Sequence, residues 1–432
     1  MSEELLAGFA VKAIKPPLGV TMAGFAARKG GSTGTHDELR THAMVLKSGT
    51  EWAVVVSMDL VEAPDDLVER VRNRVSAATD IPEGAILIGS THTHSGPLVS
   101  GRFGATEESA VINQIEEATI DAILSALKGL EPAKIKIGSM EVHDIARNRR
   151  SLEPSPDPWV NFIGFYSREV LVGCLVNFPL HATVLGAENR LLTADYPGYL
   201  RSTIQKAHPD CCTLFLNGAA GNINIGYSAD ASALGEVFDF RTFEKAAEVG
   251  EKLGAAVVEG LAMAKWTKDI ALEVQNARVP LPLKKLPSVQ ELNSRIEQQS
   301  EAVKRLRVQG AAEGAVAKAE ISKIYLECLR DSMIRRGIEG HTELAMPIQA
   351  IRIGSAVLVA IPGELFVELG LGIRQSRQDL HVFVAGYANG SWGYLPTADA
   401  FELGGYEVET SVFDENMGNA LVDGASKLVA LF

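Results

Sequence analysis

Four segments of the chain place residues that can bind a metal or move a proton directly after a run of apolar residues. The segments are AILIGSTHTHSGP, with His92 and His94; LVNFPLHATVL, with His181; LVAIPGELF, with Glu364; and FVAGYANGSWGYLPT, with Tyr394. Such runs are typical of strands, and ligands tend to bind beyond strand ends, where loops are free of ladder hydrogen bonds. We therefore expect these residues to gather at one site.

His92 and His94 are separated by a single residue, which is a useful spacing for a metal. On an extended segment, residues i and i+2 point the same way, so both imidazoles can reach one ion. Hydroxyl groups on Thr91, Thr93 and Ser95 could orient the imidazoles from behind. The alternative for this pair is two ordinary hydrogen-bonded histidines.

His181 and Glu364 have structural alternatives as well. A single histidine at a strand end is often structural, and a glutamate after Pro-Gly can serve as the N-terminal carboxylate of a helix. The convergence of several such groups is what favours a metal, because a few N/O protein ligands with a position left for water are typical of catalytic zinc. The sequence therefore predicts one zinc ion per chain.

A second group of polar residues lies in the N-terminal part of the chain. Asp59 ends the strand-like run AVVVSMD, and His36 and Asp37 lie in a glycine-rich loop. These residues could join the predicted site or support a second metal. A hydrogen-bond network within the loop is the alternative.

The composition is that of a globular protein and argues against several kinds of partner. The formal net charge of -13 repels nucleic-acid phosphates and anionic membrane surfaces, so we expect a small-molecule substrate. The four cysteines have no CxxC spacing and read as free thiols. The N-terminus lacks a signal-peptide pattern, and no run approaches the ~20 apolar residues of a membrane span. A cytoplasmic setting is the expectation.

Short apolar runs alternate with amphipathic segments, which predicts an α/β fold. The predicted strands are Ala53–Ser57, Ala85–Gly89, Lys134–Ile137, Val160–Phe165, Val170–Asn177, Thr213–Leu216, Ala356–Ile361 and Val382–Ala385. The predicted helices are Asp65–Ala78, Glu107–Lys128, Tyr196–Ala207, Phe243–Met263 and Phe366–Arg377.

Residues 288–336 differ from the rest of the chain. This stretch is rich in Glu, Gln, Lys, Arg and Ala and is interrupted by Gly310 and Gly314, which predicts a hairpin of two long helices. We interpret it as an insertion within a single domain that spans residues 1–432. It could be an arm for homo-oligomerisation, a lid over the site, or a solvated insertion.

In combination, these motifs resemble the N-terminal catalytic domain of the neutral/alkaline non-lysosomal ceramidase family. The family's patterns GTHTHSGP, PGEF and Asn-Arg-Ser-Pro resemble Ser90–Pro97, Pro362–Leu365 and Asn148–Arg149. Its C-terminal and N-terminal patterns resemble Asn389, Tyr394–Thr397, Tyr406–Ser411 and Gly24–Ala26. The resemblance covers nearly the whole chain apart from the predicted helical hairpin.

The resemblance implies both a site and a fold. The implied zinc ligands are His92, His181, Glu364 and Tyr394, and the residues implied around the scissile amide carbonyl are His94, Arg149 and Tyr406. The implied core consists of two packed mixed β-sheets flanked by helices, a four-layer sandwich. We adopt this architecture as the predicted fold.

Three departures from the family pattern bear on the substrate. The family's nucleophilic serine falls on Gly218 and its aspartate on Asn222. The chain also ends where the family's catalytic domain ends, and it shows no secretion signal. These departures argue against ceramide itself as the substrate.

The predicted activity is therefore hydrolysis of a small soluble amide, an N-acyl compound, by metal-bound water. His94 would act as general base or proton shuttle, and Arg149 and Tyr406 would donate to the developing oxyanion. Two alternatives stay open: an ester or sugar-derivative hydrolase or lyase on the same scaffold, and a catalytically inactive protein that binds a metal or ligand.

Overall fold

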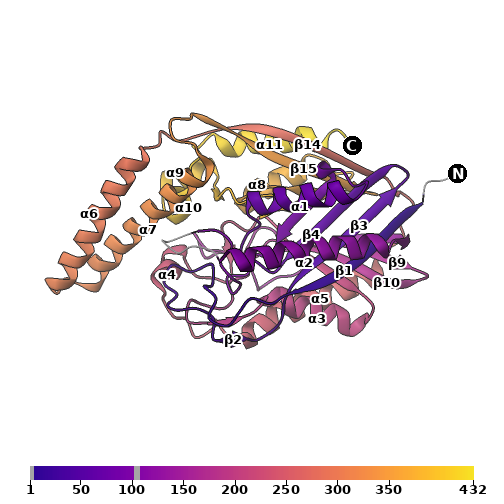
Figure 1. Ribbon diagram of the computed structural model, residues 1–432, viewed down its shortest axis with the longest axis horizontal. Helices are drawn as coiled ribbons and strands as arrows, with labels where there is room; N and C mark the ends of the chain where they lie inside the picture. The colour runs from indigo at the N-terminus through magenta and orange to yellow at the C-terminus, as the bar shows by residue number, and fades with distance from the viewer. Residues whose placement is uncertain (1–3, 102–107) are drawn as a thin grey trace.

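The computed structural model describes residues 4–101 and 108–432 of the chain. Within these ranges, three larger β-sheets lie between layers of helices (Figure 1). The first sheet has the order β5-β4-β3-β1-β6. Its strands are β1 (Leu5–Ile14), β3 (Leu39–Ser48), β4 (Glu51–Met58), β5 (Ile86–Ser90) and β6 (Glu131–Pro132).

The second and third sheets have four strands each, in the orders β12-β10-β9-β7 and β14-β15-β16-β18. The second contains β7 (Lys134–Glu141), β9 (Trp159–Ser167), β10 (Val170–Phe178) and β12 (Cys212–Asn217). The third contains β14 (Leu272–Pro282), β15 (Glu343–Ile353), β16 (Ala356–Ala360) and β18 (His381–Ala385). Asn177 of β10 donates through Nδ2 to the carbonyls of Leu216 in β12 and Val384 in β18, at 3.0 Å each, so these two sheets lie side by side.

Three short strand pairs and eleven helices complete the described structure. The pairs are β2 (Gly34–Thr35) with β11 (Leu191–Leu192), β8 (Arg147–Asn148) with β13 (Ile223–Asn224), and β17 (Glu364–Leu365) with β19 (Tyr394–Leu395). The helices are α1 (Asp65–Ala78), α2 (Ser109–Lys128), α3 (Tyr196–Ala207), α4 (Ala229–Leu234), α5 (Phe243–Met263), α6 (Val289–Val308), α7 (Glu313–Arg336), α8 (Val367–Gln375), α9 (Ala398–Leu403), α10 (Tyr406–Thr410) and α11 (Met417–Val429), with a 3₁₀ turn at Glu83–Ala85.

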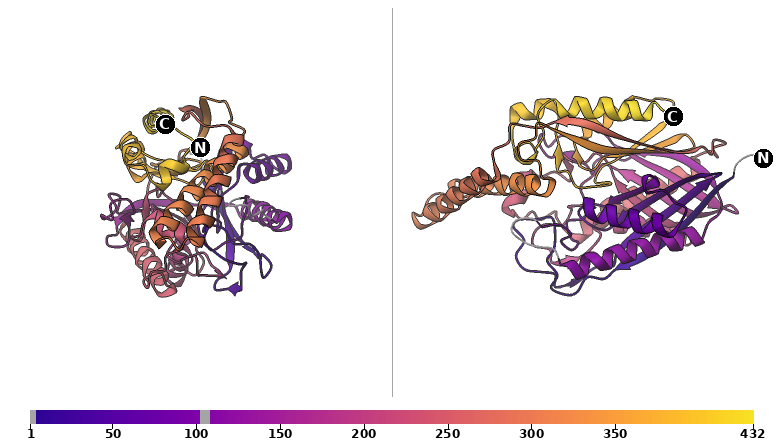
Figure 2. Two further views of the ribbon diagram at one scale, coloured as in Figure 1. Left: turned by 90° about the vertical axis from the view of Figure 1, so that its left-hand side faces the viewer. Right: turned by 45° about the horizontal axis from the view of Figure 1, so that its top comes forward.

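The apolar side chains divide into layers that explain this arrangement. One buried cluster takes residues from all three sheets, among them Met44, Leu175 and Leu358. Three further clusters lie on the outer faces, under α1 and α2, under α3 and α5, and under α8 and α11. Burial of these faces is the main term that holds the sandwich together, and the views of Figure 2 show the helices outside and the sheets inside.

The predicted α/β sandwich is confirmed, with one difference in the sheets. The prediction had one sheet in each of two layers. In the structure, one of these layers consists of the two four-stranded sheets side by side. All eight predicted strands are present, but β1, β3, β14 and β15 were missed. In β14 and β15, polar or charged residues and prolines interrupt the apolar residues. The predicted start of α2 at Glu107 lies outside the described residues, and α2 begins at Ser109.

Candidate active site

Backbone hydrogen bonds draw the loops that follow β5, β10 and β18 into one place. Asn389 N donates to Ile88 O at 2.7 Å, and Ser90 N donates to Tyr387 O at 3.1 Å, which joins the end of β5 to the loop after β18. His94 N donates to Ala182 O at 3.3 Å, which joins the β5 loop to the loop after β10. Strand ends from all three sheets therefore meet at a single point.

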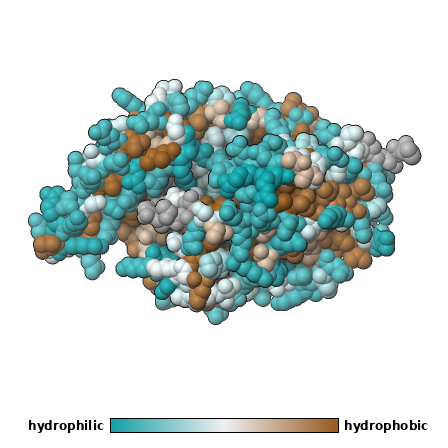
Figure 3. All heavy atoms as spheres, in the orientation of Figure 1, coloured by the Kyte–Doolittle hydropathy of each residue, from teal (hydrophilic) through white to brown (hydrophobic). Residues whose placement is uncertain are grey.

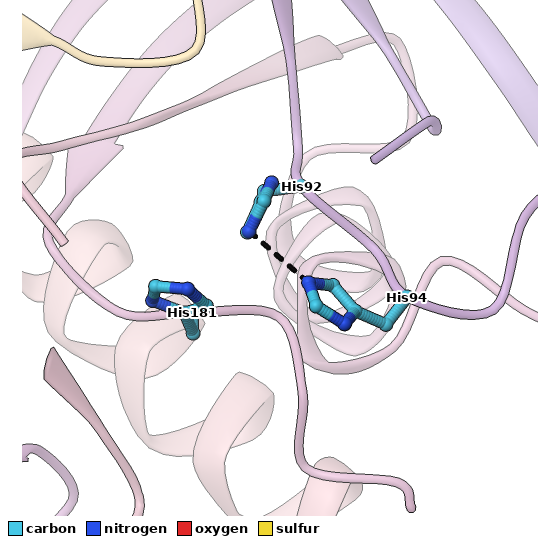
Figure 4. A group of neighbouring side chains, drawn as sticks. All are labelled: His92, His94 and His181. Atoms are coloured by element: carbon cyan, nitrogen blue, oxygen red, sulfur yellow. Dashed lines mark hydrogen bonds between the residues drawn. The ribbon is translucent and has the colours of Figure 1, made fainter. Parts of the chain in front are cut away.

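The side chains of His92, His94, His181 and Glu364 converge at this point. Figure 4 shows the three imidazoles turned toward one another, and each offers a ligand atom within 4.8 Å of the others. The Nε2 atoms of His92 and His94 lie 3.1 Å apart. Glu364 Oε2 lies 3.5 Å from His92 Nε2 and 3.3 Å from His181 Nε2. The structure therefore brings His92, His94, His181 and Glu364 together.

These separations fit a metal ion. Two nitrogen or oxygen ligands about 2.0 Å from one zinc ion lie about 3.3 Å apart at the tetrahedral angle. Glu364 is buried, and its Oε2 has no hydrogen-bond partner. A buried carboxylate oxygen without a partner is costly, and a cation between it and the two imidazole nitrogens would remove that cost.

Main-chain carbonyls fix the orientation of two imidazoles. His92 Nδ1 lies 2.5 Å from Val61 O, and His181 Nδ1 lies 2.6 Å from Ala220 O. An N–H that donates to a carbonyl leaves Nε2 with a lone pair directed at the shared point. Burial lowers the pKa of His92 and of His181 to about 3, so both rings are neutral near pH 7, as metal ligands must be.

The orientation of His92 differs from the prediction. His92 has φ of 64°, so the segment is not extended there, and the imidazoles converge because the chain turns sharply. The hydroxyl groups of Thr91, Thr93 and Ser95 were expected to orient the imidazoles, but they have other partners or none. Thr93 Oγ1 donates to Thr193 O at 2.8 Å, Ser95 Oγ accepts from Asn189, and Thr91 Oγ1 has no partner.

Tyr394 joins Glu364 through the backbone. The two residues pair in the short parallel ladder of β17 and β19, and their side chains line one small cavity together with Tyr406. Burial raises the pKa of Tyr394, so its hydroxyl is protonated in the metal-free site. The ring of Tyr406 packs edge-on against Tyr394, with centroids 5.5 Å apart.

Arg149 lies beside the histidines. Its Nη1 donates to His181 Nε2 at 3.4 Å, its guanidinium lies 5.3 Å from the centre of the Tyr394 ring, and its buried Nη2 has no partner. The backbone N–H of Arg149 donates to Asn222 O at 2.8 Å, which fixes the residue to the loop before β13. Arg149 therefore presents a free N–H donor inside the site.

Four predicted or suspected positions do not join the cluster. His36 and Asp37 line a separate cavity of about 330 Å³, and Asp59 forms a bidentate ion pair with Arg201. A Cβ atom at Gly218 would lie 2.9 Å from Pro179 N, so a side chain at that position would collide with the backbone of Pro179.

Sequence reasoning missed two residues of the site. Tyr387 stacks on the His92 imidazole with ring centres 4.0 Å apart, and Glu407 accepts hydrogen bonds from Arg149 and Arg150. Both lie inside segments that the motif analysis quoted. Nothing in the local pattern marks them, because their roles depend on partners far away in the chain.

Comparison with known proteins finds one family for the N-terminal half of the described site. Residues 8–213 match the family described as neutral/alkaline non-lysosomal ceramidase, N-terminal. The chain is 23% identical over 385 residues to neutral ceramidase of Pseudomonas aeruginosa, an alignment that covers 77% of this chain and 57% of that protein. It is also 33% identical over 99 residues to neutral ceramidase A of Dictyostelium discoideum, which is 18% of this chain and 14% of that one.

Residues 8–213, slightly less than half of the chain, are thus similar to the neutral/alkaline non-lysosomal ceramidase family. The fold agrees: the crystal structure of neutral ceramidase from Pseudomonas aeruginosa superposes with a TM-score of 0.77 at 20% identity, over 100% of this chain and 75% of that one. A ceramidase complexed with C2 superposes with a TM-score of 0.76, also at 20% identity and over the same shares of both chains. The chain spans about 57% of the length of the Pseudomonas relative. Across residues 4–101 and 108–432, we find no helix both long and apolar enough for a bilayer crossing.

Proposed function

We propose that this ceramidase-like chain is a zinc-dependent amidohydrolase that cleaves a small soluble N-acyl compound. The observation that carries the proposal is the buried, unpartnered Oε2 of Glu364, which faces the Nε2 atoms of His92 and His181 at 3.5 and 3.3 Å. A neutral imidazole pair with a carboxylate is a donor set that zinc prefers. The proposed ligands are His92, His181, Glu364 and Tyr394.

A zinc ion held by these residues would supply a Lewis acid and lower the pKa of a coordinated water to about 7. The chain's own residues supply the remaining tasks. The unpartnered Nη2 of Arg149 is a donor for the oxygen that becomes negative when the amide carbonyl is attacked. Tyr406, beside Tyr394, offers a second donor to the same region.

His94 is the proposed carrier of the proton. Its ring packs against Phe25 with centres 4.9 Å apart, and its Nε2 faces the shared point from beside His92. The ring occupies the space that a Cβ at Gly24 would need, with the Gly24 Cβ position only 2.4 Å from His94 Cβ. A glycine at position 24 is thus required for His94 to stand where it can exchange a proton with the leaving amine.

The proposal is tested by metal analysis together with hydrolysis of generic chromogenic amides. We expect about one zinc per chain, turnover that a chelator abolishes, and loss of both in His92→Ala. Glu364→Gln should lose metal and activity while remaining folded. His143→Ala is the matched control, because His143 is exposed and pairs with Glu141, and it should change neither.

The outcome also separates the alternatives. Turnover of esters or sugar derivatives without amide cleavage would favour an ester or sugar-derivative hydrolase or lyase on the same scaffold. A folded chain that binds zinc but turns over none of these substrates would favour a binding protein. A chain that takes up no zinc when zinc is supplied would contradict the proposal.

A further inference from the structure

The helical hairpin of α6 and α7 is the connection between two neighbouring strands. β14 and β15 pair in antiparallel fashion up to Pro282 and Glu343, and Leu283 N donates to Thr342 O at 2.9 Å. The hairpin leaves the body at this end of the sheet (Figures 1 and 2), and its surface is mostly hydrophilic (Figure 3). Leu292 of α6 and Met333 of α7 join the apolar core, so the base of the hairpin is anchored.

The anchored end of α7 forms one wall of the candidate active site. Cys328, Asp331, Ser332 and Arg335 of α7 line the same cavity as Glu364, Tyr394 and Tyr406. The Sγ of Cys328 lies 3.9 Å from the hydroxyl of Tyr406. This wall is mostly polar and includes two charged side chains. Asp331 pairs with Arg330, and Arg335 donates to Ser100. An apolar acyl chain placed against this wall would take these charged groups out of contact with water, which is costly.

The space beside Glu364 is small. The cavity against α7 has a volume of about 20 Å³, and a second cavity, lined by His92, Glu364, Ser391 and Trp392 among others, also has about 20 Å³. Each holds roughly one water molecule, whereas small-molecule sites have volumes of about 300–1,000 Å³. A substrate therefore needs a passage that this arrangement closes.

Two arginines at the end of α7, Arg335 and Arg336, line a large outer groove next to these cavities. The groove has a volume of about 1040 Å³, and Arg335, Ser391 and Trp392 line it as well as one of the inner cavities. Arg336 lies over the Trp392 ring at 4.2 Å, donates to Asp65 Oδ2 at 3.0 Å, and also donates to Ser391 O. Arg335 Nη1 donates to Ser100 Oγ at 3.3 Å.

We propose that Arg335 and Arg336 form a side-chain gate at the end of α7, and that this gate with the α7 wall restricts the site to small polar amides. The inference rests on the proposed hydrolytic function and names the substrate class of the same site. Arginine side chains are long and rotatable. Asp65, the partner of Arg336, is half-exposed, so water can take its place when the gate opens. The helix itself stays anchored through Met333, so the wall keeps its position while the gate opens.

The first test is the rate at which excess dipicolinate removes zinc from the holoprotein. Arg336→Gln removes the positive charge that pairs with Asp65. We expect this variant to release zinc about tenfold faster than the wild type, a factor that corresponds to about 1.4 kcal/mol. Asp65→Asn weakens the same ion pair by removing the negative charge, and it should also speed zinc release. It keeps the test usable if Arg336→Gln fails to fold.

Each variant has a matched control: one in the same helical hairpin as Arg336, the other on the same helix as Asp65. Arg307→Gln breaks the ion pair with Glu320 within the hairpin, and Asp66→Asn breaks the neighbouring pair with Arg70 on α1. Both controls should release zinc at the wild-type rate. Equal release rates in the gate variants and their controls, from a protein that holds zinc, would overturn the gate alone. A chain that holds no zinc overturns the proposed function, and the gate with it.

The second test is selectivity for acyl length, measured with N-acetyl and N-octanoyl amides of one chromogenic amine. We expect the wild type to prefer the acetyl compound by roughly tenfold or more, as a small polar site requires, and Arg336→Gln to narrow this ratio. A wild type that cleaves the octanoyl compound as fast as the acetyl one would overturn the restriction to small amides.

Discussion

Glu407 holds Arg149 in place through a buried ion pair, with Arg149 Nε 2.6 Å from Glu407 Oε1. Burial alone would raise the pKa of Glu407, but the charges of Arg149 and Arg150 outweigh it, and the pKa is lowered. The carboxylate is thus charged near neutral pH. It aligns the guanidinium whose other end, Nη2, is free inside the site.

We expect Glu407→Gln to reduce both stability and hydrolysis. Breaking one side of a buried ion pair typically costs about 3–5 kcal/mol, and a misaligned oxyanion donor costs roughly 100-fold or more in kcat. Urea unfolding and kcat measure the two effects separately. Glu409→Gln is the control, because Glu409 is exposed in the same short helix. A Glu407→Gln variant with unchanged kcat would show that Arg149 needs no alignment.

His94→Ala separates a proton carrier from a metal ligand. The 3.1 Å between His94 Nε2 and His92 Nε2 would also suit two ligands of one zinc ion. We expect His94→Ala to retain zinc and to lose hydrolysis by roughly 100-fold or more, in the range of general acid–base catalysis. Zinc content and kcat on the same preparation decide the point. Zinc loss equal to that of His92→Ala would make His94 a ligand.

Asp59→Asn tests whether the N-terminal polar group takes part in metal binding. Both oxygens of Asp59 bind Arg201, at 2.8 and 2.7 Å, and one also accepts from Arg40 N. We expect a loss of about 3–5 kcal/mol in the free energy of unfolding, since Arg201 loses its buried partner, and no change in zinc per chain. Asp80→Asn, at an exposed position, should alter neither. A fall in zinc content would revive the second-metal hypothesis.

The stability of the protein should depend on pH through His42, which lies outside the metal cluster. Burial lowers the pKa of His42 well below 6.5, and the charges of Arg201 on α3 and Arg40 on β3 add to the effect. The imidazole of His42 is therefore protonated near pH 6.5 in the unfolded chain, but only at lower pH in the folded protein. The stability tied to neutral His42 is therefore present above pH 6.5 and is lost as pH falls below it.

His42→Leu removes this dependence. Between pH 6 and pH 5, the wild type should lose about 1.4 kcal/mol per pH unit relative to the variant. Urea unfolding of both proteins at several pH values measures the difference. A constant difference from pH 7.5 to pH 5 would mean that His42 titrates alike in the folded and unfolded states.

Local sequence patterns predicted many of the elements because those elements are marked by their own residues. The bounds of α1, α3 and α5 agree with the prediction, since each helix carries an apolar stripe at helical spacing. β15 was missed for the opposite reason. Pro347, Gln349 and Arg352 interrupt its apolar residues, and pairing with its neighbours β14 and β16 makes it a strand.

By itself, the sequence determined which residues could do the chemistry. His92, His181 and Glu364 were predicted because each follows an apolar strand, and a side chain's type and its place after a strand are local properties. The family resemblance added Tyr394, Arg149 and Tyr406 to this set, and it did so through motifs that are also local.

Only the tertiary structure decided how these residues are held and what can reach them. His92 is oriented by the carbonyl of Val61 and Arg149 by Glu407, and Arg335 of a distant helix lines the cavity beside Glu364. These partners are separated by 31 residues in the first case and 258 in the second. No local pattern encodes such pairings, because they exist only once burial of the three sheets has brought the strand ends together.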